Sequence, residues 1–148
     1  MRVYIMRGLP GCGKSTWIKS RLPVTVKVVS ADHFHTGADG VYRYDPKKAG
    51  EAHGDCLREF TRALNNKDTI QNLVVDNTNT SIGEIAPYVA LALAFGVEHE
   101  IIYLPCSVEK SIARNVHAVP HGTILEMNRR LFAESLPPHW NVRVEVSP

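Results

Sequence analysis

Residues 8–15 constrain the fold of this chain more than any other stretch, because they read G-L-P-G-C-G-K-S. This is the G-x-x-x-x-G-K-S pattern of a phosphate-binding loop, in which backbone N–H groups cradle phosphate oxygens at a helix N-terminus. An apolar run at residues 2–6 precedes the loop and helix-forming residues 13–22 follow it, as the motif requires. We therefore expect a nucleoside triphosphate site formed by Gly8, Leu9, Pro10, Gly11, Cys12, Gly13, Lys14, Ser15 and Thr16.

Short apolar runs predict the strands of a sheet. Runs that are too short for helices lie at residues 2–6, 24–30, 72–76 and 98–104. In residues 141–146 valines alternate with charged residues, which indicates a closing strand with one solvated face at a sheet edge.

Apolar residues at helical spacing predict the helices between these strands. They are expected at 13–22, from Asp45-Pro46 to Leu64, up to Gly96, at 107–116, and onward from a Thr123–Glu126 capping box. The start of the third helix stays open: Ser81 and Glu84 resemble a capping box, but a helix starting near Pro87 fits as well. The alternation predicts a single α/β domain over residues 1–148, with a mostly parallel sheet whose ligands lie at the carboxyl ends of its strands.

Two carboxylates follow predicted strands and are candidates for chemistry. Asp32 can act as a base that accepts the proton of an attacking hydroxyl, or it can cap a turn. Asp76 is placed to support, directly or through water, a Mg²⁺ ion that the Ser15 hydroxyl ligates, or it is a polar residue that ends the strand. Lys14 reaches the β and γ phosphates. The polar residues Asn77, Thr78 and Asn79 share this edge with Asp76 and are candidate substrate contacts.

A basic residue and a broken helix suggest a lid. Arg114 lies about 200° around its predicted helix from Ile112, so it points away from the apolar stripe. Pro120 and Gly122 then interrupt the helix, which predicts a lid over about residues 114–122. From these residues alone, Arg114 is either a solvated surface residue or a lid arginine that stabilises a transferring phosphoryl group.

Composition excludes several classes of protein. The 148 residues are 44% hydrophobic and 22% charged with a net charge of +2, as in an ordinary globular domain, and no run is long enough for a membrane span. We therefore expect an intracellular, cytoplasmic protein (host cytoplasm if the source is viral). Three widely spaced cysteines and the H-x-H pair of His33 and His35 give no metal-binding spacing.

Together these motifs resemble the 5′-hydroxyl polynucleotide kinase family of P-loop kinases, and most of all its NEDD4-binding-protein-2-like branch. The matching pieces are RGLPGCGKST, SADHF, GVYRYDP with EAH, VVDNTNT, PYVALA and ARNVHAVP, in the family's order over residues 5–125. The resemblance implies a five-stranded sheet in the order 2-3-1-4-5. It also implies that Asp32 is the general base and that Arg114 is a lid arginine on the donor phosphates.

Three positions depart from the phage members of this family. His35 stands where they carry an arginine for the acceptor phosphate, and Ala118 stands where they carry a second lid arginine. The aspartate of their third-strand motif falls at Asn77, whereas Asp76 matches the D-N-T-N branch. Recognition of the acceptor is therefore the part of the resemblance with the least support from the residues, and His35 is a candidate substrate contact.

The sequence as a whole predicts a kinase that uses ATP and Mg²⁺ and transfers the γ-phosphate to a hydroxyl, most simply the 5′-OH of DNA or RNA. One alternative acceptor is a hydroxymethyluracil base in DNA or a small alcohol. A second alternative is a nucleotide-binding module that hydrolyses ATP slowly, although Asp32 argues against it. Trp17 and Trp140 can stack on a base, but their surroundings favour partly buried core positions.

Overall fold

The computed structural model describes residues 1–22 and 25–146, and it contains a five-stranded sheet in the order β2-β3-β1-β4-β5. Every neighbouring pair of strands is parallel, and in the register Ile5 lies opposite both Val75 and Ile101. The predicted strand order and parallel sheet are thereby confirmed. The strands are β1 (Arg2–Arg7), β2 (Val26–Val29), β3 (Asn72–Val75), β4 (Glu98–Tyr103) and β5 (Val142–Val144). Pro23 and Val24, at the predicted junction of the first helix and second strand, lie outside the described residues.

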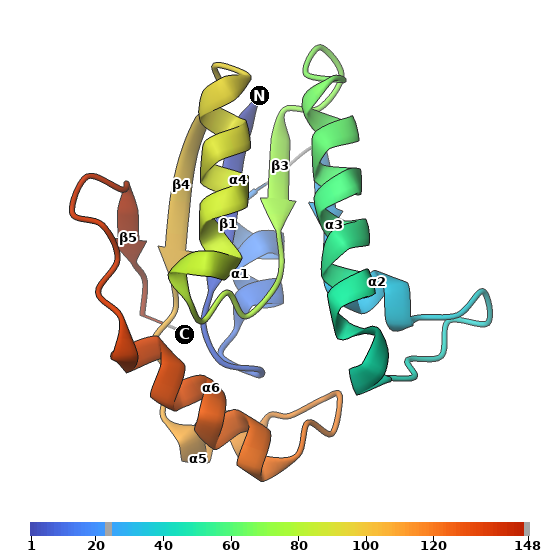
Figure 1. The fold of residues 1–148 in the computed structure, drawn as a ribbon, viewed down its shortest axis with the longest axis vertical. Coiled ribbons are helices and arrows are strands. Elements are labelled where there is room, and N and C mark those ends of the chain that lie inside the picture. The colour runs from blue at the N-terminus through green and yellow to red at the C-terminus, as the bar shows by residue number, and fades with distance from the viewer. Residues whose placement is uncertain (23–24, 147–148) are drawn as a thin grey trace.

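Helices cover both faces of the sheet and gather at its carboxyl edge (Figure 1). The helices are α1 (Lys14–Arg21), α2 (Ala31–His35), α3 (Ala49–Leu64), α4 (Ile82–Ala94), α5 (Val108–Ala113) and α6 (His121–Ala133), with a 3₁₀ turn at Pro46–Lys48. In the view of Figure 1, α3 and α4 lie in front of the strands, α1 lies behind them, and α5 and α6 lie below the strand ends. None of the described helices has the length and apolar character that crossing a bilayer requires.

Alternating side chains of β1 join the two apolar layers. Val3 and Ile5 pack with Phe60 of α3 on one face, and Tyr4 and Met6 pack with residues of α1 on the other. Because both faces of a central parallel strand are covered, its residues read as a continuous apolar run. The same burial fixes the end of β1, and hence the position of the phosphate-binding loop that follows it.

The third large helix begins at its capping box. The Ser81 hydroxyl accepts from the Glu84 N–H, and the Glu84 carboxylate accepts from the Ser81 N–H, so both halves of the box are present. Pro87 lies inside the helix, where it removes one backbone donor. Of the two starts left open by the sequence, the capping box is therefore the one that the structure contains.

Two predicted helix boundaries near the lid are wrong. The helix predicted to reach residue 116 ends at Ala113, and Val116 is 89% exposed. The last helix has Pro120 at its N-cap and begins at His121, so Thr123 is no cap. Pro120 accounts for the second error, because it is the N-cap residue with an extended ψ of 140° and the helix begins directly after it. The valine spacing suggested a longer helix, but Val116 does not lie on a buried helix face.

The closing strand lies at the sheet edge as predicted, but its apolar side is not covered. Val144 is 62% exposed, whereas the intervening Arg143 forms an ion pair with the buried Glu100 of β4. The alternation in residues 141–146 therefore predicts the strand correctly, but it does not predict which side of the strand is buried.

Candidate active site

The phosphate-binding loop between β1 and α1 needs glycine at two points of close approach. A Cβ atom at Gly8, where φ is +148°, would lie 2.7 Å from the carbonyl oxygen of Leu104. At Gly11, where φ is +72°, it would lie 2.8 Å from the carbonyl oxygen of Arg114. The loop is therefore packed against the segments that follow β4 and α5, and any larger residue would push them apart.

Lys14 and Ser15 begin α1 and face the same edge as Asp76. The Lys14 ammonium donates to the carbonyl oxygens of Gly8 and Leu9 at 3.1 and 3.0 Å. The Ser15 hydroxyl donates to the Asp76 Oδ2 atom at 3.4 Å. Burial raises the pKa of the Asp76 carboxyl, the nearby Lys14 charge opposes this, and the charge of Asp32 adds to it.

These oxygen ligands fit a hard divalent cation. Among the described residues, no group of three or more His, Cys, Asp or Glu side chains could hold a metal by itself. Mg²⁺ suits such a site, because it keeps several waters and binds through one or two protein oxygens together with phosphates. Ser15 and Asp76 are the residues that would hold it.

Asn77 joins the ends of β2 and β3 and so places Asp32 beside Asp76. The Asn77 Oδ1 atom accepts from the Ala31 N–H at 2.9 Å, and the Ser30 hydroxyl donates to the Asp76 carbonyl at 2.8 Å. Ser30 also caps the short α2 by accepting from the Asp32 N–H. Because β2 and β3 are neighbours, both carboxylates lie at one edge of the sheet, as the sequence predicted.

Two residues that the sequence analysis did not assign surround the Asp32 carboxylate. The Tyr42 hydroxyl donates to Asp32 Oδ1 at 3.3 Å, and the His117 Nε2 atom lies 3.8 Å from Asp32 Oδ2. Tyr42 belongs to a hairpin whose strands meet in a bridge between Thr36 and Tyr42. The available signal was the run of apolar and aromatic residues Val41, Tyr42 and Tyr44 in a loop with two glycines.

The exposed Arg114 is the last residue of the α5 turn, and its backbone lies against Gly11. One turn earlier, the Ser111 hydroxyl donates to the Pro10 carbonyl at 2.6 Å, which ties α5 to the phosphate-binding loop. The predicted lid arginine is thus anchored beside the donor site.

The remaining predicted substrate contacts are more enclosed. The His35 ring is buried and makes edge contact with Tyr44, with ring centroids 4.9 Å apart. Asn79 is fully buried and donates to the Met6 carbonyl, while the Thr78 carbonyl accepts from the Gly8 N–H. The structure therefore places these three residues where they shape the loops around the site.

Both tryptophans pack into the core rather than beside Asp32. Trp17 is buried against Tyr4, with ring centroids 5.8 Å apart, and Trp140 packs on the apolar layer that contains Phe60. These positions agree with the core interpretation of the two residues.

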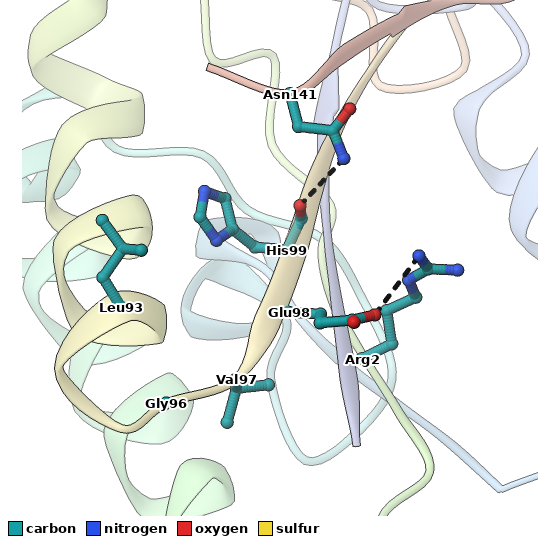
Figure 2. Close-up of a pocket in the computed structure, with 7 residues that line it drawn as sticks. All are labelled: Arg2, Leu93, Gly96, Val97, Glu98, His99 and Asn141. Carbon is teal, nitrogen blue, oxygen red and sulfur yellow. Dashed lines mark hydrogen bonds and ion pairs between the residues drawn. The ribbon is translucent and has the colours of Figure 1, made fainter. Parts of the chain in front are cut away.

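A separate hollow of about 490 Å³ lies at the other end of the sheet (Figure 2). Its lining includes Arg2 and Glu98, the first residues of β1 and β4, which form an ion pair at 3.3 Å. The phosphate-binding loop follows the last residue of β1, so this hollow takes no part in the candidate active site.

The parallel sheet in this order, with a G-x-x-x-x-G-K-S loop between β1 and α1, defines a P-loop protein with the kinase type of fold. A family model described as "AAA domain" matches residues 3–132. The chain belongs to this family.

Named relatives agree with that assignment. NEDD4-binding protein 2 from Homo sapiens is 36% identical over 134 residues, which cover 84% of this chain and 7% of that protein. A structure described as the Pnkp1/Rnl/Hen1 RNA repair complex matches with a TM-score of 0.68 and 18% identity over 88% of this chain and 43% of that chain. The APS kinase CysC of Mycobacterium tuberculosis, solved with AMPPNP and APS, matches with a TM-score of 0.60 and 12% identity over 98% and 87% of the two chains. The chain thus spans 7% of the first protein and less than half of the chain in the second. The resemblance predicted from sequence is confirmed at the level of family and fold.

Proposed function

We propose that this chain is a Mg²⁺-dependent kinase that transfers the γ-phosphate of ATP to the 5′-hydroxyl of DNA or RNA. The observation that carries the proposal is the meeting of the phosphate-binding loop, Asp76 and Asp32 at one edge of the sheet. A pure ATPase needs a group that positions water, whereas a kinase needs a carboxylate that accepts the proton of an alcohol.

The reaction assigns one role to each side chain. Lys14 and the amides of the loop bind the β and γ phosphates, and Ser15 and Asp76 would hold a Mg²⁺ ion that would supply positive charge there. Asp32 accepts the proton of the acceptor hydroxyl while the hydroxyl oxygen forms a bond to the γ-phosphorus. The bond from that phosphorus to ADP breaks, and Arg114 stabilises the charge on the transferring group.

Exposed residues at the end of the hairpin and on the turn that follows it favour a nucleic-acid acceptor. Tyr44 is 54% exposed, and Lys47 and Lys48 follow it on an exposed turn. In the described part of the chain neither lysine forms an ion pair. An aromatic ring and free cations suit a single-stranded end, because bases stack on the ring and phosphates pair with the cations. The Pnkp1 match to an RNA repair complex supports the same class of acceptor.

The deciding experiment follows label from γ-labelled ATP into three kinds of acceptor. These are oligonucleotides with a 5′-OH, DNA that contains hydroxymethyluracil, and a panel of small alcohols. We expect label in the first class; label in small alcohols alone would overturn the polynucleotide assignment. Release of free phosphate without any labelled acceptor would instead support the slow ATPase module.

Asp32→Asn tests the base. We expect it to lower transfer by about 10³-fold or more while ATP binding stays nearly intact, since a base contributes mainly to the chemical step. Asp68→Asn is the matched control, because Asp68 is exposed at the opposite end of α3 from the site. Unchanged transfer in Asp32→Asn would remove this residue from the mechanism.

A further inference from the structure

Three elements bring side chains around the Asp32 carboxylate. Asp32 lies on α2, Tyr42 lies on the hairpin at residues 36–44, and His117 lies between α5 and α6. The Tyr42 and His117 rings contact each other, with centroids 4.3 Å apart and planes tilted by 40°. The three side chains therefore form one cluster that joins the lid to the hairpin.

Within this cluster the two oxygens of Asp32 have different surroundings. Oδ1 accepts the Tyr42 hydroxyl at 3.3 Å, which satisfies that oxygen. Burial, together with the charge of Asp32, raises the pKa of Tyr42 to about 12, so the phenol stays a donor at any working pH.

The other oxygen faces His117 across a gap. The distance from Oδ2 to His117 Nε2 is 3.8 Å, which is too long for a direct hydrogen bond. A hydroxyl oxygen that lies to one side of the line joining these two atoms can be about 2.8 Å from each of them, within hydrogen-bond distance of both. Such a hydroxyl donates its proton to Oδ2 and accepts from an Nε2–H.

The backbone holds His117 in this position. Asn115 closes a turn onto Val119, accepting from its N–H at 2.9 Å and donating to its carbonyl at 2.6 Å. Ala118 within the turn has φ at +51°, which directs the chain back toward α6. Arg114, at the start of the same turn, lies against Gly11 of the donor loop. One short segment therefore reaches the donor with Arg114 and the acceptor with His117.

We propose that His117 binds the acceptor hydroxyl opposite Asp32 and that Tyr42 is the positioning residue that fixes both partners. This inference rests on the proposed function, since it assigns how the same site holds its acceptor. His117 thereby supplies, from the lid, an acceptor contact on the side of the site where the family's second lid arginine is replaced by Ala118.

Steady-state kinetics with a 5′-OH oligonucleotide test the two roles separately. His117→Leu should raise the acceptor KM by about 10-fold, the effect expected of one lost hydrogen bond, with ATP affinity unchanged. His117→Gln, which keeps a donor, should recover most of the loss. Tyr42→Phe keeps the ring contact and should lower kcat by roughly 10-fold with little change in KM. The exposed His121→Leu on the same lid is the control.

An unchanged acceptor KM in His117→Leu, or an equal loss of ATP affinity, would overturn the assignment. NMR of the histidine ring protons separates this failure from failure of the kinase itself. With AMPPNP bound, a 5′-OH oligonucleotide should shift the His117 signals, and Tyr42→Leu should shift them without any acceptor. If the wild type labels no acceptor, the proposed function fails; if it labels one while the His117 signals stay fixed, only this inference fails.

Discussion

Gly11 is the residue at which the donor loop touches the lid, and its lack of a side chain can be tested directly. Gly11→Ala would place a Cβ atom 2.8 Å from the Arg114 carbonyl oxygen, at a φ of +72°. Gly40→Ala is the matched control, because Gly40 has a φ of +75° and open space around it. Both should lose about 1 kcal/mol from the left-handed backbone. Only Gly11→Ala should lose more than this and also displace Arg114.

The measurement is urea unfolding together with turnover. We expect turnover to fall about 10-fold or more in Gly11→Ala, because a small displacement of a positioning group is costly to catalysis. Equal stability and equal turnover in the two variants would show that the contact has no consequence.

In the protein without ligands, the buried carboxylate of Asp76 should lower the free energy of unfolding. Since burial raises the pKa of this carboxyl in the folded state, the folded protein loses stability as pH rises through that raised pKa. Without Mg²⁺ or nucleotide, Asp76→Asn should therefore raise the free energy of unfolding at pH 7 by about 1 kcal/mol. The gain should vanish below the ordinary carboxyl pKa of 3.8, where Asp76 becomes protonated in both states.

Thermal unfolding at several pH values, with phosphate transfer measured in parallel, checks this prediction. In Asp76→Asn, phosphate transfer should fall although the free energy of unfolding rises. A variant that is less stable at pH 7 would mean that the Ser15 hydrogen bond outweighs the cost of burial.

For single residues, the sequence predicts site residues that belong to motifs and misses those whose position depends on the conformation of a loop. Asp32 and Asp76 follow strands, and strand ends of a parallel sheet share one edge, so their meeting could be predicted. Tyr42 and His117 are 75 positions apart in two loops of irregular backbone. Nothing in their spacing indicates contact, because loop conformation depends on individual turns such as the one closed by Asn115.

At the scale of elements, the hairpin and the 3₁₀ turn beside α2 carry the predicted selectivity for polynucleotides. Tyr44→Ala, and separately Lys47→Ala combined with Lys48→Ala, should raise KM for an oligonucleotide by about 10-fold, since stacking on a base contributes about 1–3 kcal/mol. The lysine variant should also weaken the salt dependence of KM. The same variants should leave ATP affinity unchanged, because these residues lie outside the donor loop.

Initial rates measured at several salt concentrations give KM and its dependence on salt. The exposed Arg62→Ala on α3 is the control for loss of a positive charge. Unchanged KM in both hairpin variants would favour a small acceptor.

The helix boundaries show which local signals decide an element. The capping box at Ser81 fixes the start of α4 even though Pro87 follows, because two backbone donors are satisfied by it at once. A similar pair at Thr123 and Glu126 fails, because Pro120 is already the N-cap of a helix that begins at His121. A capping pattern therefore predicts a boundary only where no proline defines another one nearby.

At the scale of the whole molecule, Arg7 connects the central strand to both α6 and the loop after β3. This side chain is 4% exposed and donates to the carbonyl oxygens of Asn79 and Leu131 at 2.9 and 3.2 Å. Arg7→Met should leave both carbonyls unpaired and lower the free energy of unfolding by about 3 kcal/mol. Arg21→Met, at the exposed end of α1, should change it by less than about 0.5 kcal/mol.

Chemical denaturation of the two variants checks this, and their turnover adds a second readout. Because Leu131 lies on α6, which directly follows the predicted lid, loss of Arg7 should also reduce turnover by loosening the packing of α6. Equal stability of the two variants would mean that water replaces the guanidinium at no cost.

The alternation of strands and helices was enough to predict a parallel α/β domain, since each apolar run reads as a strand covered on both faces. The order of the strands came from the family resemblance. Local patterns describe which elements form, whereas strand order depends on how the elements pack. Burial on β5 shows the limit most clearly, because an alternating edge strand gives no indication of whether a partner covers its valines.

That edge strand also bears on pairing between neighbouring molecules. β5 is only three residues long, and its Arg143 is held by Glu100 and Glu145. Without it, the longer and more apolar β4 would present unpaired backbone groups to neighbouring molecules, the usual route to strand addition and aggregation. A short strand with a charged residue at its centre is a poor template for further pairing. β5 thus closes this edge of the sheet and disfavours the addition of a strand from another molecule.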